Sequence, residues 1–154
     1  MKSLLVICAA ALTAFSLTGA SFGNDKPWPE NHGRVAKRLF VTPDESQLPA
    51  DASKRPLIVA MGGAEGGNAW SGPRAQAMRN AFLSDGYALL ALGYFGAPGT
   101  PEKLDRIALE GVRNAIAEAA KHPNVDARCI ALIGGSKGAE LALLLASRDP
   151  SIKA

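Results

Sequence analysis

Residues 134–138, Gly-Gly-Ser-Lys-Gly, have the types and spacing that could carry chemistry. They satisfy the pattern Gly-x-Ser-x-Gly and stand between an apolar stretch, 129–134, and an apolar run that starts at Ala139. In a nucleophile elbow, a serine sits on a sharp turn from strand to helix, and small neighbours leave room for the chain. We therefore expect Ser136 to present a nucleophilic hydroxyl, with Gly134 and Gly138 as the glycines of the turn.

Two backbone amides are candidates for stabilising an oxyanion beside this serine. The Lys137 amide follows the serine at the start of a helix, where the helix dipole favours negative charge. The glycine-rich stretch 62–67 follows the first apolar strand, which is where such sites place their second donor. The Ala64 amide is the natural candidate there, with that of Glu65 as an alternative. We interpret the side chain of Glu65 as a turn or substrate-loop group and that of Lys137 as directed towards solvent.

Binding of phosphate or nucleic acid is disfavoured. Glycine-rich turns before helices can bind phosphate, but no Gly-Lys-Ser/Thr occurs at 134–138, and 62–67 departs from G-x-G-x-x-G by an alanine at its third position. The 154 residues carry a formal net charge of only +3, without a cluster of basic residues interleaved with aromatics. No nucleic-acid partner is expected.

The elements that must position these residues alternate along the chain. Apolar runs of strand length at 56–61, 87–92 and 129–134 predict strands buried on both faces, and 35–41 is a possible edge strand. Helices are expected over 71–84 with Met78 and Phe82 on the inner side, over 104–119, and over 139–147. Residues 151–154 are expected to begin another strand. The alternation predicts an α/β fold with a parallel sheet flanked by helices.

The N-terminus has the layout of a secretory signal peptide, residues 1–23. Lys2 precedes an apolar run over 4–17, and small residues follow up to Gly23. The run is short and rich in alanine, so no stable membrane insertion is expected after cleavage. The protein is therefore expected to be secreted or periplasmic. Residues 24–55 would form a tether that includes the possible edge strand. Cys129 would be the only remaining cysteine, which we interpret as a core residue.

Three segments, in order, resemble the acyl-CoA thioester hydrolase and bile acid-CoA:amino acid N-acyltransferase C-terminal family. They are LIVAMGGAEGG, ALGYFGAPGTPEKLDRIALE and ALIGGSKGAELALLLASRDPSIKA. The family is a branch of the α/β-hydrolase fold near the dienelactone hydrolases. The resemblance implies acyl transfer from a small-molecule ester or thioester, through a Ser or Cys nucleophile backed by an Asp and a His, without metal or cofactor. Ser136 stands at the nucleophile position, which favours hydrolysis over transfer to amino acids.

Two features depart from the family. Residues 24–55 are too few for the immunoglobulin-like domain of its eukaryotic members. The family order is Ser, Asp, His, and no histidine follows Ser136. His122 precedes the elbow strand and Asp149 ends the elbow helix, so both are expected at the opposite edge of the sheet, about 15–20 Å away; His32 lies in the tether. Residues 56–154 are accordingly expected to be the front half of a hydrolase domain, truncated after the elbow helix.

The sequence thus favours a serine hydrolase that cleaves an ester or thioester through an acyl-Ser136 intermediate. Because an exported protein would not meet cytosolic acyl-CoA, a carboxylesterase or dienelactone hydrolase-like activity is an alternative. A non-catalytic truncated product is the alternative from another class.

Overall fold

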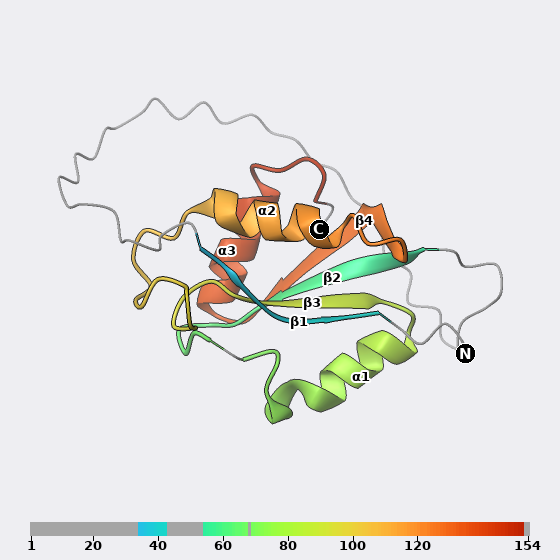
Figure 1. Cartoon of the computed structure of the whole chain (residues 1–154), viewed down its shortest axis with the longest axis horizontal. Coiled ribbons are helices and arrows are strands. Elements are labelled where there is room, and N and C mark those ends of the chain that lie inside the picture. Colours follow the sequence, from blue (N-terminus) through green and yellow to red (C-terminus); the bar gives the residue numbers. More distant parts are fainter. Residues whose placement is uncertain (1–33, 43–53, 68, 153–154) are drawn as a thin grey trace.

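The computed structural model describes residues 34–42, 54–67 and 69–152 (Figure 1). Within them a four-stranded sheet has the order β1-β3-β2-β4. Three strands run parallel: β2 (Arg55–Met61), β3 (Ala88–Gly93) and β4 (Val125–Gly134). The possible edge strand predicted over 35–41 is confirmed as β1 (Ala36–Val41), which pairs antiparallel with β3. The expected α/β fold is therefore present, with an antiparallel edge on an otherwise parallel sheet.

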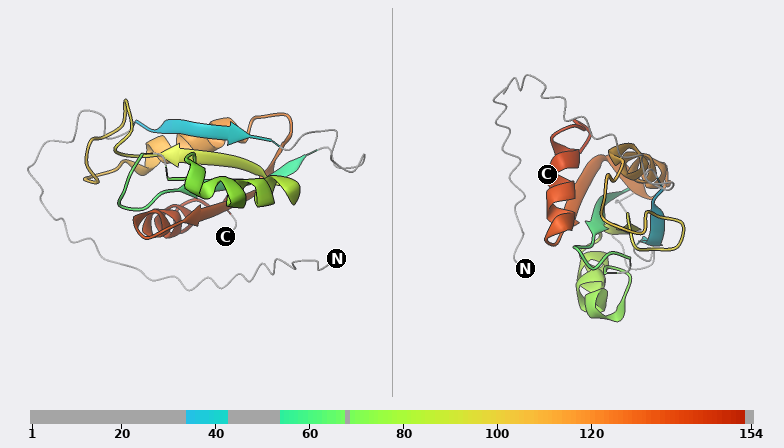
Figure 2. Two further views of the ribbon diagram at one scale, coloured as in Figure 1. Left: turned by 90° about the horizontal axis from the view of Figure 1, so that it is seen from below. Right: turned by 90° about the vertical axis from the view of Figure 1, so that its left-hand side faces the viewer.

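Helices cover both faces of the sheet, as Figures 1 and 2 show. On one face lies α1 (Gln76–Ser84), preceded by the 3-10 turn Pro73–Ala75, and on the other lie α2 (Leu109–Ala119) and α3 (Lys137–Ala146). Side chains of β2 divide between two clusters because they alternate along a strand. Leu57, Val59 and Met61 pack in the cluster that includes α2 and α3, whereas Ile58 and Ala60 pack with Trp70 and Phe82.

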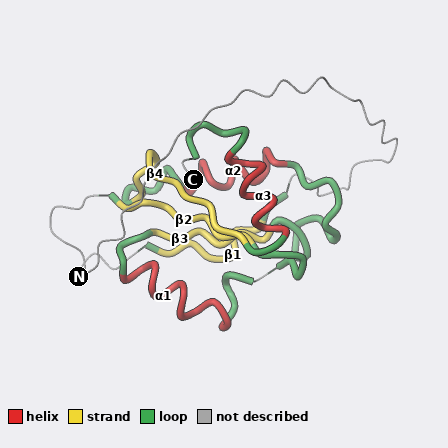
Figure 3. Tube along the Cα trace, turned by 180° about the vertical axis from the view of Figure 1, so that it is seen from behind, coloured by secondary structure: helices red, strands yellow, loops and turns green. Residues whose placement is uncertain are grey.

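The strands β2 and β3 hold the site in place. Every residue of β3 is buried, and so is every residue of β2 after Pro56, as predicted from their unbroken apolar runs. Met61, the last residue of β2, pairs with Leu92 of β3 on one side and with Gly134 of β4 on the other. The loops after β2, β3 and β4 therefore leave the sheet at one edge (Figure 3, strands in yellow).

The prediction that β4 is buried on both faces is wrong. The strand begins at Val125 rather than at Cys129, and most of its residues are partly or fully exposed. Cys129 itself is exposed, not in the core. The reason is topological: β4 lies at an edge of the described sheet, and an apolar run does not distinguish an edge position from a central one.

Two helices differ from their predictions. No residue of α1 is buried, and Met78, expected on its inner side, is 49% exposed. Helix α2 begins at Leu109 instead of residue 104, because Arg106 has a φ of 49°, which a continuous right-handed helix cannot include. Ile107 nevertheless packs against the core from the preceding loop.

Helix α3 is apolar on nearly all sides, as its sequence indicated. Leu141 and Leu145 are buried, whereas Leu143 is 72% exposed. Several predictions lie outside the described residues: the signal peptide, most of the tether with His32, and the end of the strand expected over 151–154. No helix in the described ranges is long and apolar enough to span a membrane.

Candidate active site

Ser136 lies on the sharp turn that its sequence predicts. It directly precedes α3, with φ 49° and ψ −116°, a conformation that an L-residue rarely adopts and that costs about 1–3 kcal/mol. Gly134 makes the turn possible, since a Cβ there would overlap the carbonyl group of Gly138. Such strain persists where surrounding contacts fix the backbone, and it is concentrated at functional sites. The elbow is therefore present in geometry.

Gly138 brings the first turn of α3 against the end of β2. A Cβ at this position would lie 2.5 Å from the carbonyl oxygens of both Met61 and Gly62. Only glycine allows this approach. Both predicted elbow glycines are thus required by contacts, one within the turn and one with the neighbouring loop.

The loop after β2 lies directly beside the serine. A Cβ built on Gly63 would be 3.3 Å from the Cβ of Ser136 and 3.1 Å from the Gly135 carbonyl oxygen. Gly63 donates its amide to Glu65 Oε1 at 3.0 Å, and the Gly66 amide donates to the Gly63 carbonyl at 3.2 Å. The loop therefore folds as a tight turn with Ala64 and Glu65 at its tip.

In this arrangement the amides predicted as oxyanion donors are not used in hydrogen bonds among the described residues. The amides of Gly63, Gly66 and Gly67 have acceptors, the last being the Phe95 carbonyl at 2.9 Å. Among the described residues, no acceptor is identified for the amides of Ala64 and Glu65. Lys137 is the first residue of α3, where an amide has no partner within the helix.

Two aromatic side chains, one from each face of the sheet, hold the end of β2 and the start of the loop that follows it. The Trp70 indole donates from Nε1 to the Met61 carbonyl at 3.0 Å, and the Tyr94 hydroxyl donates to the Gly62 carbonyl at 2.7 Å. Burial, with smaller contributions from Glu65 and Glu140, raises the pKa of Tyr94 to about 12. The phenol therefore stays protonated at neutral pH and can donate this hydrogen bond.

The sequence did not single out Tyr94 or Trp70. The one available signal was the position of Tyr94, directly after β3 at the edge where all three loops emerge. Its partner Gly62 lies 32 positions away, a pairing that no local pattern reveals.

The side chain of Lys137 is 45% exposed, in line with the expectation that it is directed towards solvent. Its Nζ contacts both carboxylate oxygens of Glu140 at 2.8 Å, in an exposed ion pair along α3. Lys137 is therefore a candidate through its backbone amide alone.

Two hollows flank the elbow. One, of about 290 Å³, is lined by Gly63 and Gly135 beside the serine, and further by Glu65, Trp70, Arg74 and Met78. The other, of about 380 Å³, is lined by Tyr94, Lys137 and Glu140, with Leu104, Arg106 and Leu144 among its remaining walls. The serine thus lies between two spaces that could receive the two halves of a substrate.

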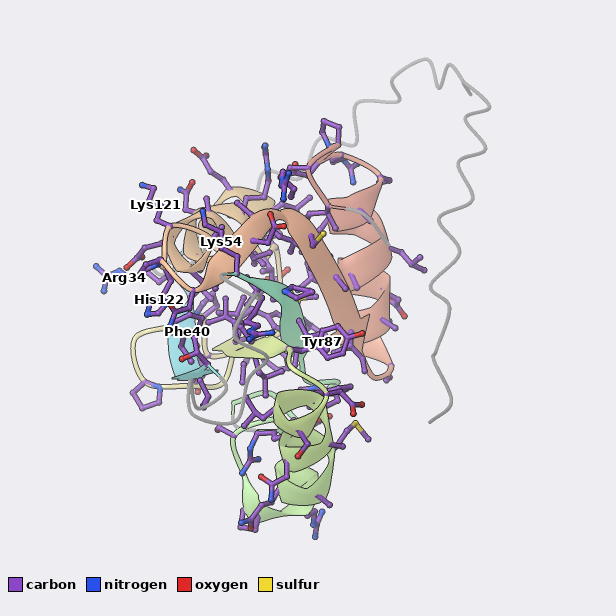
Figure 4. The ribbon with its side chains drawn as sticks, turned by 90° about the vertical axis from the view of Figure 1, so that its right-hand side faces the viewer. Arg34, Phe40, Lys54, Tyr87, Lys121 and His122 are labelled. Atoms are coloured by element: carbon purple, nitrogen blue, oxygen red, sulfur yellow. The ribbon has the colours of Figure 1, made fainter. Side chains whose placement is uncertain are left out.

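Neither His122 nor Asp149 reaches the serine. His122 precedes β4 and packs edge-on against Phe40, with ring centroids 5.2 Å apart (Figure 4). Because Val125 pairs with Arg55 and Gly134 with Met61, β4 spans the same length as the seven residues of β2, about 20 Å, which places His122 at the opposite edge of the sheet from Ser136, as expected. Asp149 instead accepts hydrogen bonds from Ser151 and from Arg113 Nε, the latter at 3.0 Å. The pKa of its carboxyl is lowered, chiefly by Ser151 and then by Arg113.

No group of three potential metal ligands occurs in the part of the chain that the structure describes.

The sequence is similar to a known protein family over the segment that contains the elbow. Residues 107–154, which include the elbow, match the family model described as BAAT / Acyl-CoA thioester hydrolase C terminal. The predicted family resemblance is confirmed. Mouse acyl-coenzyme A thioesterase 6 is 34% identical over 119 residues, 77% of this chain and 25% of the relative. Mouse acyl-coenzyme A amino acid N-acyltransferase 1 is 32% identical over 114 residues, 74% of this chain and 24% of the relative. The chain thus spans about a quarter of the length of these thioester hydrolase family relatives.

Solved structures show the α/β-hydrolase fold. An acetyl xylan esterase from Paenibacillus sp. R4 superposes with a TM-score of 0.55 and 25% identity, over 74% of this chain and 41% of the other. Est1E from Butyrivibrio proteoclasticus superposes with a TM-score of 0.56 and 19% identity, over 73% of this chain and 43% of the other. The fold expected for the thioester hydrolase family is therefore the fold observed.

Proposed function

We propose that this protein is a serine hydrolase of the α/β-hydrolase fold that cleaves a small-molecule ester or thioester through an acyl-Ser136 intermediate. One observation carries the proposal: Ser136 has a positive φ on a strand-to-helix turn, against Gly63 of the loop after β2. A turn that served only to connect β4 to α3 would not require this strain. A strained turn of this kind is what presents a serine hydroxyl above the sheet edge in a nucleophile elbow.

In this mechanism the serine oxygen attacks the carbonyl carbon, and the carbonyl oxygen becomes an oxyanion. The amides of Lys137 and Ala64 would donate to that oxygen from the two sides of the elbow. Donors of this kind are fixed before the reaction, and removing one typically costs about 10²–10³ in kcat. The contacts of Trp70 and Tyr94 with the β2 loop support the role of Ala64, because they hold the loop still.

The serine also needs a base, because a serine hydroxyl is a weak nucleophile by itself. His122 is too far away, as shown above. We infer that the base is a histidine outside the described residues, and that its orienting acid is a carboxylate other than Asp149. Activity and ligand binding should therefore be measured with the full natural protein.

Thioesters and carboxylesters are both candidate substrates. Two of the mouse relatives are named as acyl-coenzyme A thioesterases, which favours a thioester. The esterase from Paenibacillus favours an ester. Both reactions release an acyl group to water and make the same demand on Ser136 and its oxyanion donors.

A fluorophosphonate probe tests the nucleophile directly. Such probes phosphonylate only activated serines, so tryptic mass spectrometry should find the added mass on the peptide that contains Ser136. Labelling should disappear in Ser136→Ala and persist in the control Ser147→Ala, whose hydroxyl donates to the Leu144 carbonyl on the exposed end of α3. If the folded protein stays unlabelled, the non-catalytic alternative is correct.

Export is a separate proposal and rests on the sequence of residues 1–23 alone. Mass spectrometry of protein taken from the periplasm or medium should find an N-terminus near Ser21 or Asn24. Intact Met1 on protein from the cytosol would contradict it.

A further inference from the structure

The smaller hollow beside Ser136 combines a carboxylate with an indole. We propose that it is an acyl subsite for a cationic group, such as a quaternary ammonium close to the carbonyl of the substrate. This inference deepens the proposed function and rests on it. It assigns a charge to the acyl group, which neither the elbow nor the fold determines.

Glu65 is held where it can act on the substrate. Its Oε1 accepts the Gly63 amide at 3.0 Å, which fixes the carboxylate over the turn. Its Oε2 lies 2.7 Å from the position that a Cβ on Gly63 would take, and that position is 3.3 Å from the Cβ of Ser136. One carboxylate oxygen is thus tethered, and the other lies near the glycine that contacts the nucleophile.

The charge of Glu65 is not neutralised within the protein. Among the described residues, no lysine or arginine nitrogen lies within ion-pair distance of its carboxylate, although Asp126, Asp149 and Glu140 each have such a partner. A cation on the substrate could therefore form the ion pair that the protein leaves open. Two unit charges about 5 Å apart change an equilibrium roughly fourfold even with the full screening of water.

Trp70 supplies a second attraction for a cation. Trp70 is one of the residues that line the same hollow, and its indole is fixed by the hydrogen bond from Nε1 to the Met61 carbonyl. Indole rings bind ammonium groups through the electrostatics of the ring face, and quaternary ammonium ligands are a frequent case. A fixed carboxylate and a fixed indole in one space fit a trimethylammonium group better than an alkyl chain alone.

Arg74 is the other charged group of this hollow, and its charge has the opposite effect. It belongs to the 3-10 turn Pro73–Ala75 and is exposed. Removing its charge should strengthen the binding of a cation, whereas removing that of Glu65 should weaken it. These opposite signs make the proposal testable with two substitutions in one hollow.

A pair of isosteric ketones measures the preference without any turnover. Trimethylammonioacetone and 4,4-dimethyl-2-pentanone have nearly the same shape and differ by one charge. Their Kd values would be measured by NMR titration with the full natural protein, following the Gly63 and Trp70 signals. The wild-type protein should bind the cationic ketone more tightly, with about fourfold from Glu65, an addition from Trp70 and a reduction from Arg74. Equal affinities in the wild-type protein would overturn the proposal, whatever the variants do.

The variants then assign the preference to its residue. Glu65→Gln keeps an acceptor for the Gly63 amide and should bring the ratio of the two Kd values close to one, while Arg74→Gln should increase it. Glu140→Gln, a carboxylate of the other hollow, should leave the ratio unchanged. An unchanged ratio in Glu65→Gln would contradict the assignment. If Ser136 proves not to be the nucleophile while the ratio holds, the proposed function fails and the cation site remains.

Discussion

The hydroxyl of Tyr94 and the carbonyl of Gly62 form a buried hydrogen bond of 2.7 Å that joins the residue after β3 to the loop after β2. In a trans peptide the carbonyl and the next amide point in opposite directions. By fixing the Gly62 carbonyl, Tyr94 therefore also fixes the orientation of the Gly63 amide. That amide donates its hydrogen bond in the opposite direction, to Oε1 of Glu65. The position of the Ala64 amide depends on both contacts.

Replacement of Tyr94 by Phe should disturb catalysis more than binding. The Gly62 carbonyl would lose its donor in a buried place, which costs about 1–3 kcal/mol of stability. The loosened loop would misplace the Ala64 amide, so kcat should fall about tenfold or more with little change in KM. Steady-state kinetics and thermal denaturation of Tyr94→Phe measure both effects.

Tyr87→Phe is the matched control for that substitution. Tyr87 is partly buried on the opposite face, where it contacts Phe82, and is remote from the elbow. Its kcat should equal that of the wild-type protein. If Tyr94→Phe also kept the full wild-type kcat, Tyr94 would not be needed to position the loop after β2.

Two glycines of the elbow should respond very differently to a methyl group. Gly138→Ala would force a Cβ against the carbonyl oxygens of Met61 and Gly62, and overpacking of this kind costs about 1–3 kcal/mol or more. A Cβ on Gly135 would have no heavy atom of a non-neighbouring residue within 4 Å. Denaturant titration should therefore show a clear loss for Gly138→Ala and little change for Gly135→Ala. Equal losses would mean that α3 does not pack on the β2 loop as described.

The hydrogen bonds that Asp149 accepts from Ser151, together with its ion pair with Arg113, should make stability depend on pH at the acid end. The folded protein lowers the pKa of Asp149 below its ordinary value. The carboxylate therefore stabilises the fold above the unfolded pKa of about 3.9, and this contribution is lost as pH falls through the lower folded pKa. Between pH 5 and 2, the Tm of the wild-type protein should fall more than that of Asp149→Asn. Parallel curves would show that Asp149 contributes nothing through its charge.

The sequence predicted the parts of the fold that depend on local pattern. Apolar runs located β2 and β3, and the glycine spacing located the turn at Ser136. The same patterns could not tell that β4 is an edge strand, because edge and central strands share apolar residues; Cys129 was misplaced for that reason.

Contacts between residues far apart in the chain could not be predicted from the sequence, for a different reason. The partners Tyr94 and Gly62 are brought together only by the register of β2 and β3. Likewise, the tethering of Glu65 to Gly63 depends on the exact shape of a turn. The candidate nucleophile could thus be predicted, whereas the residues that hold its surroundings could not.

The central claim is that Ser136 is the nucleophile, and hydrolysis of a p-nitrophenyl ester by the full natural protein tests it most directly. Wild-type and Ser147→Ala proteins should give the same kcat/KM, while Ser136→Ala should lose several orders of magnitude with an unchanged thermal melt. Retention of more than about a tenth of the wild-type kcat/KM in a folded Ser136→Ala protein would contradict the account, since loss of such a nucleophile cannot be that mild.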